Sequence, residues 1–160
     1  MSHYKIGFSL VIAGLFIQCN SVKRLQIAEI EEEVTVRRDQ WGINHIEAKN
    51  EHDLFFAQGY LAAKDRLFQF ELWRRKATGT SAELVGPAAL KSDIGARLLR
   101  YQKDMDTELN HYHPRGKSII ESYVAGVNAY IEQTEKNPEL LPFEFNLLGI
   151  KPGRWTPEIV

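Results

Sequence analysis

Apolar side chains recur along residues 53–79 with the spacing of one long helix. This segment, DLFFAQGYLAAKDRLFQFELWRRKATG, contains no proline and, before its last residue, only Gly59 as a glycine. Asp53 is expected to cap the helix, because its carboxylate accepts hydrogen bonds from the free N–H groups of the first turn. Gly79 is expected to end the helix, because glycine tolerates a positive φ.

The apolar positions of this helix form two neighbouring stripes, which is more than a surface helix needs. One stripe holds Leu54, Leu61, Phe68 and Leu72, and the other holds Phe56, Tyr60, Ala63, Leu67 and Phe70. A helix that is apolar over most of its circumference is expected to be buried. Asp65 and Arg66 stand in its middle, and buried charges require partners. We therefore expect these two residues to form internal ion pairs in a large core.

The preceding residues alternate between apolar and polar with the period of a β-strand. Residues 34–37 and 43–48 show this alternation, and the second run places Ile43, His45 and Glu47 on one face. Between them, residues 38–42 (RDQWG) have the composition of a turn, in which Gly42 can adopt a positive φ. The pattern predicts an N-terminal β-hairpin.

The second half of the chain predicts three further helices. They cover residues 82–84 after a cap at Thr80 or Ser81, a run from Ser92 or Asp93 to 109, and residues 115–136. Pro138 ends the last of these. Residues 141–155 are expected to be an aromatic-rich connection with a turn at Pro152–Gly153. The three tryptophans, Trp41, Trp73 and Trp155, are expected in the core.

Thr156, Pro157 and Glu158 have the order in which a helix begins, with a cap followed by proline at the first helical position. The sequence stops two residues later. We therefore expect the 160 residues to be the N-terminal fragment of a longer chain.

The first residues predict export. Residues 6–17 are uncharged and largely apolar, which is too short for a membrane-spanning helix but typical of a signal-peptide core. Cys19 follows at once, as in a lipoprotein leader whose cysteine is lipidated. Two interpretations stay open, a lipoprotein and an ordinary signal peptide with an incidental cysteine. The expected organisation is a leader (1–19), a polar tether (20–33) and a domain (34–160). The expected location is the periplasm, with any membrane contact made only through a lipid anchor.

Composition narrows the function further. The chain has 160 residues, a formal net charge of −1 and one cysteine. Its near-neutral charge gives no indication that it binds nucleic acid. A single cysteine excludes a disulfide within the chain. The acidic run at residues 31–33 is expected to be solvated.

Few side chains are candidates for a metal site or for acid–base catalysis. His111 and His113 could join His45 or His52 at a metal, but His-x-His without further ligands favours a polar loop between helices. Among Asp39, Asp65 and Glu71, no spacing brings two carboxylates together. Structural ion pairs among Arg38, Asp39, Asp65 and Arg66 are favoured over catalysis, and Glu71 with Arg75 is expected to form a helix-surface pair.

Three ordered segments resemble the N-terminal part of the penicillin acylase family, the penicillin amidases. The most specific pieces are R-D-x-W-G-I-x-H-I at residues 38–46, G-Y-x-x-A-x-D-R-L-x-Q at residues 59–69 and A-G-V-N-A at residues 125–129. The resemblance extends from about residue 34 to the end of the chain. Asn44 departs from a common proline before the histidine.

The resemblance implies an α+β fold, in which this mostly helical α-chain portion with its N-terminal β-hairpin forms part of an αββα N-terminal nucleophile hydrolase sandwich. Such enzymes are zymogens that cut themselves into an α-chain and a β-chain. The serine at the β-chain N-terminus then hydrolyses a linear amide through an acyl-enzyme, with its own α-amine as base. The implied partners are a β-chain from the same precursor and a small-molecule amide substrate.

The resemblance carries no catalytic, substrate-binding or metal residue onto this chain. None of Ser81, Ser92, Ser118 or Ser122 lies in the family's nucleophile context. No cofactor is expected in this fragment, although some full-length members bind calcium. The matched motif positions are expected to be scaffold: Arg38, Asp39, Trp41, Gly42, His45, Asp65 and Arg66.

The fragment alone is therefore expected to be inactive, and its substrate is left open among penicillins, cephalosporin side chains and acyl-homoserine lactones. A non-catalytic, lipid-anchored helical interaction module is the alternative.

Overall fold

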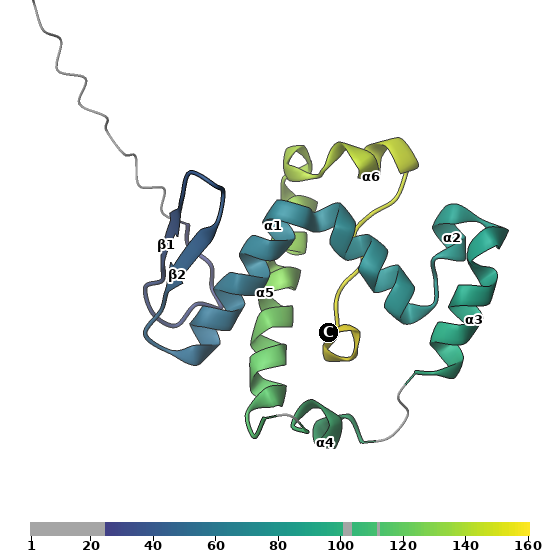
Figure 1. The fold of residues 1–160 in the computed structure, drawn as a ribbon. Helices are drawn as coiled ribbons and strands as arrows, with labels where there is room; N and C mark the ends of the chain where they lie inside the picture. Colours follow the sequence, from purple (N-terminus) through teal and green to yellow (C-terminus); the bar gives the residue numbers. More distant parts are fainter. Residues whose placement is uncertain (1–24, 101–103, 112) are drawn as a thin grey trace, which may run out of the picture.

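A computed structural model describes residues 25–100, 104–111 and 113–160 (Figure 1). The strands are β1 (Thr35–Arg38) and β2 (Asn44–Glu47); the helices are α1 (Glu51–Thr78), α2 (Ala82–Val85), α3 (Leu90–Leu98), α4 (Met105–Leu109), α5 (Gly116–Lys136) and α6 (Phe143–Leu148); the 3-10 turns are η1 (Pro87–Ala89), η2 (Pro138–Leu140) and η3 (Pro157–Ile159). The expectation of a mostly helical chain with an N-terminal hairpin is confirmed. The expected leader, including Cys19, lies outside the described residues.

Helices α1 and α5 cross at very short range, and the rest of the fold is arranged on this pair (Figure 1). Two glycines make the approach possible. A Cβ at Gly59 of α1 would lie 2.0 Å from the backbone oxygen of Tyr123, and a Cβ at Gly126 of α5 would lie 1.9 Å from that of Phe56. The glycines in two of the sequence motifs are therefore the places where the two helix backbones touch.

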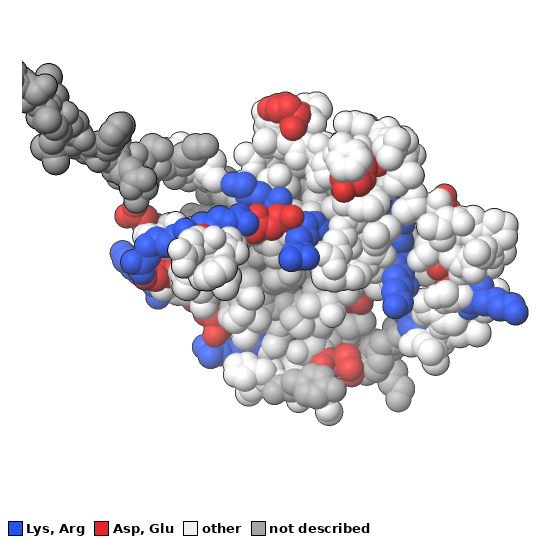
Figure 2. All heavy atoms as spheres, turned by 45° about the horizontal axis from the view of Figure 1, so that its top comes forward, with Lys and Arg blue, Asp and Glu red and all other residues white. Residues whose placement is uncertain are grey.

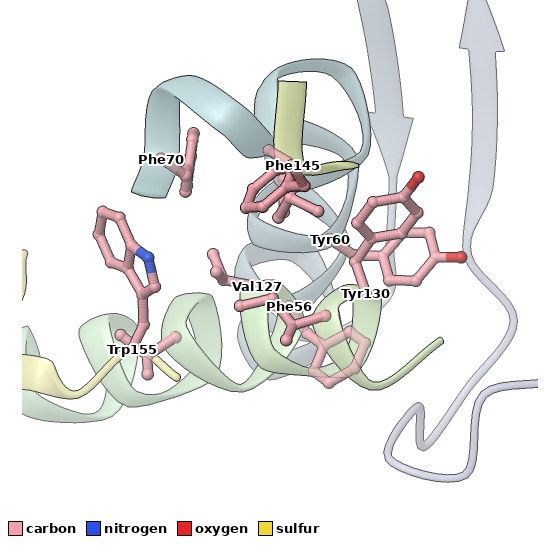
Figure 3. Close-up of a cluster of buried hydrophobic side chains, with 11 residues drawn as sticks. Phe56, Tyr60, Phe70, Val127, Tyr130, Phe145 and Trp155 are labelled. Atoms are coloured by element: carbon pink, nitrogen blue, oxygen red, sulfur yellow. The ribbon is translucent and has the colours of Figure 1, made fainter. Parts of the chain in front are cut away.

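The core lies between these helices and the C-terminal segment (Figure 3). The second predicted stripe of α1 contributes one side of this core. Its residues are all at most 6% exposed: Phe56, Tyr60, Ala63, Leu67 and Phe70. Tyr60 and Tyr130 pack edge to face with ring centroids 5.4 Å apart, as do Phe68 and Phe145 at 5.6 Å. The first stripe is only partly covered, and Leu72 is 39% exposed. The prediction that α1 is buried all round is therefore wrong for this chain.

The N-terminus of α1 is capped by Asn50, not by Asp53 as expected. The Asn50 side chain accepts from the backbone N–H of Asp53, which lies in the first turn and is fully buried. The Asp53 carboxylate accepts from the backbone N–H groups of Glu31 (3.0 Å) and Glu32 (2.8 Å) and from Asn50 Nδ2 (2.7 Å). The backbone of the acidic run is therefore fastened to α1 by one carboxylate.

Asp53 is expected to make the fold sensitive to acid. Burial raises its pKa, but its hydrogen bonds, led by those from the Glu31 and Glu32 backbone, outweigh burial and lower the pKa from 3.8 to about 2. A carboxylate with a lowered pKa contributes stability that is present above pH 3.8 and is lost as the pH falls toward 2. Asp53→Asn should cost about 2 kcal/mol at pH 7, as expected for lost hydrogen bonds to a charged group.

The measurement is urea unfolding of the wild type and Asp53→Asn between pH 6 and pH 2, with Glu47→Gln as an exposed control on the hairpin. The variant should lose less stability than the wild type over this range. Equal losses in both proteins would mean that Asp53 does not fasten the N-terminal segment.

The predicted helix from Ser92 or Asp93 to Leu109 is wrong in two respects. It is divided into α3 and α4, and it begins at Leu90. Asp93 does not cap its own helix; its carboxylate accepts from the backbone N–H groups of Ser81 (3.0 Å) and Ala82 (2.7 Å) and so caps α2. The prediction that Ser92 or Asp93 opens this helix is therefore wrong.

Residues 143–148, expected to be part of a connection, form α6. Phe145 points into the core and is fully buried, whereas Phe143 and Leu147 are 70% and 75% exposed. Gly149 ends the helix with a φ of 64°. Six residues are too few to show a helical period clearly, and tertiary contact through Phe145 stabilises the turn.

Candidate functional site

The hairpin turn is organised by Asp39. Its Oδ1 accepts from the backbone N–H groups of Trp41 and Ile43, both at 2.9 Å, and its Oδ2 lies 3.1 Å from His45 Nε2. The hydrogen bond from His45, followed by that from the Ile43 backbone, lowers the pKa of Asp39. Gly42 takes a φ of 80°, as expected. The R-D-x-W-G-I-x-H motif thus places its aspartate and histidine together, in an arrangement that holds the turn.

The hairpin is joined to α1 through Asp65. Arg38 Nη1 donates to Asp65 Oδ1 at 2.8 Å, and Asn44 Nδ2 donates to Asp65 Oδ2 at 3.1 Å. The side chains of Arg38 and Asp65 are 52% and 28% exposed. An ion pair this accessible contributes at most about 1 kcal/mol. Asp65 is therefore partly solvated and is not the internal residue that we expected.

Arg66 marks a kink in α1. Its φ of −144° and ψ of 38° are not helical. Its side chain is exposed and donates to Gln69 Oε1 at 3.2 Å. The expected burial of Arg66 is therefore also wrong.

Two of the three tryptophans lie outside the core. Trp155 is buried at 7% exposure, but Trp73 is 48% and Trp41 79% exposed. Trp41 stands in the turn between β1 and β2. The prediction of a core role is confirmed for Trp155 alone.

The buried ion cluster of this chain is centred on Glu71, which we expected on the surface. Glu71 is 1% exposed. Its carboxylate accepts from Arg74 Nε and Nη2 (both 2.8 Å), from Arg75 Nε (2.7 Å) and from the backbone N–H of Gly153 (2.9 Å). Burial raises the pKa of Glu71, but the bonds from Arg74 and Gly153 outweigh it and lower the pKa. This cluster fastens the C-terminal segment to α1.

Two of the four serines compared with the family's nucleophile use their hydroxyl groups in hydrogen bonds within their own helix region. Ser122 Oγ donates to the Ser118 carbonyl at 2.8 Å, and Ser118 Oγ donates to the Arg115 carbonyl at 3.0 Å. Ser81 contributes its backbone N–H to Asp93. Ser92 lies on the wall of a groove beside α3. The hydroxyls of Ser118 and Ser122 are thus bonded to carbonyls of their own segment.

The described ranges contain no group of three or more His, Cys, Asp or Glu side chains arranged to hold a metal ion. His45 lies at the hairpin and His52 at the start of α1, where its Nδ1 is 3.1 Å from Asp53 Oδ1. His113 Nδ1 accepts from the Arg115 backbone N–H at 3.1 Å. In the same ranges, no helix is both long and apolar enough to cross a membrane.

The face of the molecule in Figure 2 carries charges of both signs with wide uncharged areas between them. Two open grooves have largely uncharged linings, with Lys76 as the charged residue of one of them. One, of about 480 Å³, lies between β2 and α1 and is lined by Asn44, Ile46, Leu54, Phe55, Gln58, Leu61 and Ala62. The other, of about 570 Å³, lies between the end of α1 and α3. Neither contains a paired nucleophile and base.

Comparisons with known proteins place these features in a family. The penicillin amidase family model matches residues 33–160. The chain is 41% identical over 133 residues to penicillin acylase 2 proenzyme of Pseudomonas sp. (strain SE83), covering 83% of this chain and 17% of that protein. It is 35% identical over 132 residues to acyl-homoserine lactone acylase QuiP of Pseudomonas aeruginosa, covering 82% of this chain and 15% of that protein.

A solved structure shows the same likeness in three dimensions. Thermostable penicillin G acylase from Alcaligenes faecalis superposes with a TM-score of 0.71 at 33% identity, covering 79% of this chain and 67% of that chain. The chain thus spans less than a fifth of the length of the curated relatives that it matches. Because the family model covers the hairpin, α1, α5 and the C-terminal segment together, the chain belongs to the penicillin amidase family.

Proposed function

We propose that this chain is the N-terminal portion of an exported amide hydrolase, which cleaves a linear C–N amide bond through an acyl-enzyme on a serine downstream of Val160. The observation that carries the proposal is the family match over residues 33–160. The relatives are named as acylases of two substrate classes, penicillins and acyl-homoserine lactones. Amide hydrolysis is the reaction that both classes share.

In this proposal the described residues act as scaffold. Three features hold the fold of this portion: the hairpin, the α1–α5 crossing and the Glu71 cluster. The nucleophile comes from a β-chain of the same precursor. The lengths of two relatives support a precursor that is cut into two chains. The likeness covers 67% of the solved Alcaligenes chain but only 17% of the Pseudomonas proenzyme, so the solved chain is much shorter than the proenzyme. The small-molecule substrate would bind mostly outside these 160 residues.

The test is expression of the complete gene product. We expect its processing into two chains, the second beginning with serine, which mass spectrometry of the intact chains would detect. The processed protein should hydrolyse at least one member of a panel of penicillins, cephalosporins and acyl-homoserine lactones. Replacing the new N-terminal serine by alanine should abolish hydrolysis, and the 160-residue chain should be inactive. An unprocessed, inactive product would instead favour a non-catalytic interaction module.

A further inference from the structure

The groove between the end of α1 and α3 is an apolar surface without a partner in the described chain. Lys76 and Ser92 form part of its lining, and the five other lining residues are uncharged and apolar or small: Trp73, Ala77, Gly95, Ala96 and Leu99. Trp73 is 48% and Leu99 88% exposed. Contiguous apolar surface of this kind marks a site of association.

Helix α3 is held by hydrogen bonds of Asp93 and Arg97, but few of its side chains are covered by the described chain. Among its nine residues only Asp93 is buried. Its apolar side chains Leu90, Ile94 and Leu98 are 50%, 57% and 75% exposed. A helix of this length gains most of its stability from packing, so further cover over α3 would stabilise it.

The C-terminal segment is clamped before it reaches this groove. Asn128 of α5 bonds Trp155 twice, its Nδ2 donating to the Trp155 carbonyl and its Oδ1 accepting from the Trp155 N–H, both at 2.9 Å. Two residues earlier, the Gly153 N–H donates to the buried Glu71. These bonds fix the direction in which the chain continues beyond Trp155.

The end of the described chain lies close to this groove. The Phe70 ring packs against Trp155 with centroids 4.9 Å apart and against Trp73, which lines the groove, with centroids 5.5 Å apart. The hydrogen bond from Thr156 lowers the pKa of Glu158, and the charge of Arg100, just beyond α3, adds to this effect. In Figure 1 the C-terminal turn η3 lies between α5 and α3.

We propose that this groove binds the precursor segment that directly follows Val160, through an apolar face of that segment. The inference rests on the proposed function, which supplies the longer chain. Residues before Leu25 are a poorer occupant, because Glu31 and Glu32 are fastened to Asp53 at the opposite end of α1. A second copy is also disfavoured, since a segment tethered beside the groove has a high effective concentration there.

The experiment places the photo-crosslinking amino acid p-benzoylphenylalanine at position 99 in the complete gene product. Position 147 on α6 is the matched control, because Leu147 is also an exposed leucine, at 75%, on a helix that does not line the groove. After irradiation, mass spectrometry identifies the crosslinked peptide. Position 99 should crosslink within the first ~30 residues after Val160, a helical reach of about 45 Å. Its yield there should be at least tenfold above that from position 147.

Crosslinking from position 99 to residues 1–24, to a second copy or to a distant part of the precursor would overturn the inference. So would absence of any crosslink from both position 99 and a second probe at position 77. Hydrolysis of the substrate panel is measured on the same protein. An active enzyme with a crosslink elsewhere refutes only the groove assignment, whereas a gene that ends at Val160 refutes the proposed function as well.

Discussion

Gly126→Ala is expected to destabilise the chain by about 3 kcal/mol, the upper part of the usual range for overpacking. The new methyl group would stand 1.9 Å from the Phe56 carbonyl oxygen and 2.9 Å from the Tyr60 nitrogen. Both atoms belong to the backbone of α1, so no side chain can rotate away to make room. The two helices would have to separate, and the contacts of Phe56, Val127 and Tyr130 would loosen together.

Gly95→Ala is the matched control, because Gly95 is also a helical glycine but has open space around its would-be Cβ. Alanine has the higher helix propensity, so this variant should be more stable by up to about 1 kcal/mol. Urea unfolding followed by circular dichroism measures both variants. If Gly126→Ala is as stable as the wild type, the α1–α5 crossing is not as close as described here.

Glu71→Gln is expected to cost about 3 kcal/mol, at the lower end for breaking a buried ion pair by removing one partner. The amide keeps the shape of the side chain but leaves the guanidinium groups of Arg74 and Arg75, 18% and 11% exposed, without their shared anion. The Gly153 N–H also loses its charged acceptor. The C-terminal segment should therefore loosen first.

Glu132→Gln supplies the control for this substitution. Glu132 accepts from Lys136 one helical turn later on α5 at 2.9 Å, but both side chains are exposed. Such a pair contributes about 0.5 kcal/mol or less. Urea unfolding gives the two free energies, and limited proteolysis reports on residues 150–160. Similar losses in both variants would show that Glu71 behaves as the surface residue its sequence position indicated.

The sequence alone determined the local elements that depend on neighbouring residues. The hairpin followed from alternation around a turn that ends at Gly42, which takes the expected positive φ. The end of α1 at Gly79 and the end of α5 before Pro138 followed from backbone preferences of single residues. The resemblance to the penicillin amidases likewise rested on short ordered motifs, and the family match confirms it.

Tertiary structure decided which face of each element is covered and by what. Periodicity placed Asp65 and Glu71 on the same helix, but in the folded chain Asp65 meets the exposed Arg38, whereas Glu71 is covered by the segment that contains Gly153. Asp53 and Asp93 lie in the first turns of α1 and α3, but neither caps its own helix as predicted, and each bonds a segment remote in the chain. Such partners have no local signature, because they come together only after the chain has folded.

The glycines show the same division. In the sequence, Gly59 and Gly126 are positions of two of the motifs that carry the family resemblance. Their meaning comes from the crossing of α1 over α5, where each backbone occupies the space that the other's Cβ would need. The sequence by itself determined which helices exist, since helix formation depends on residues within a few turns. Contact between residues 59 and 123, or 56 and 126, depends on the meeting of two helices, and only the tertiary structure decided it.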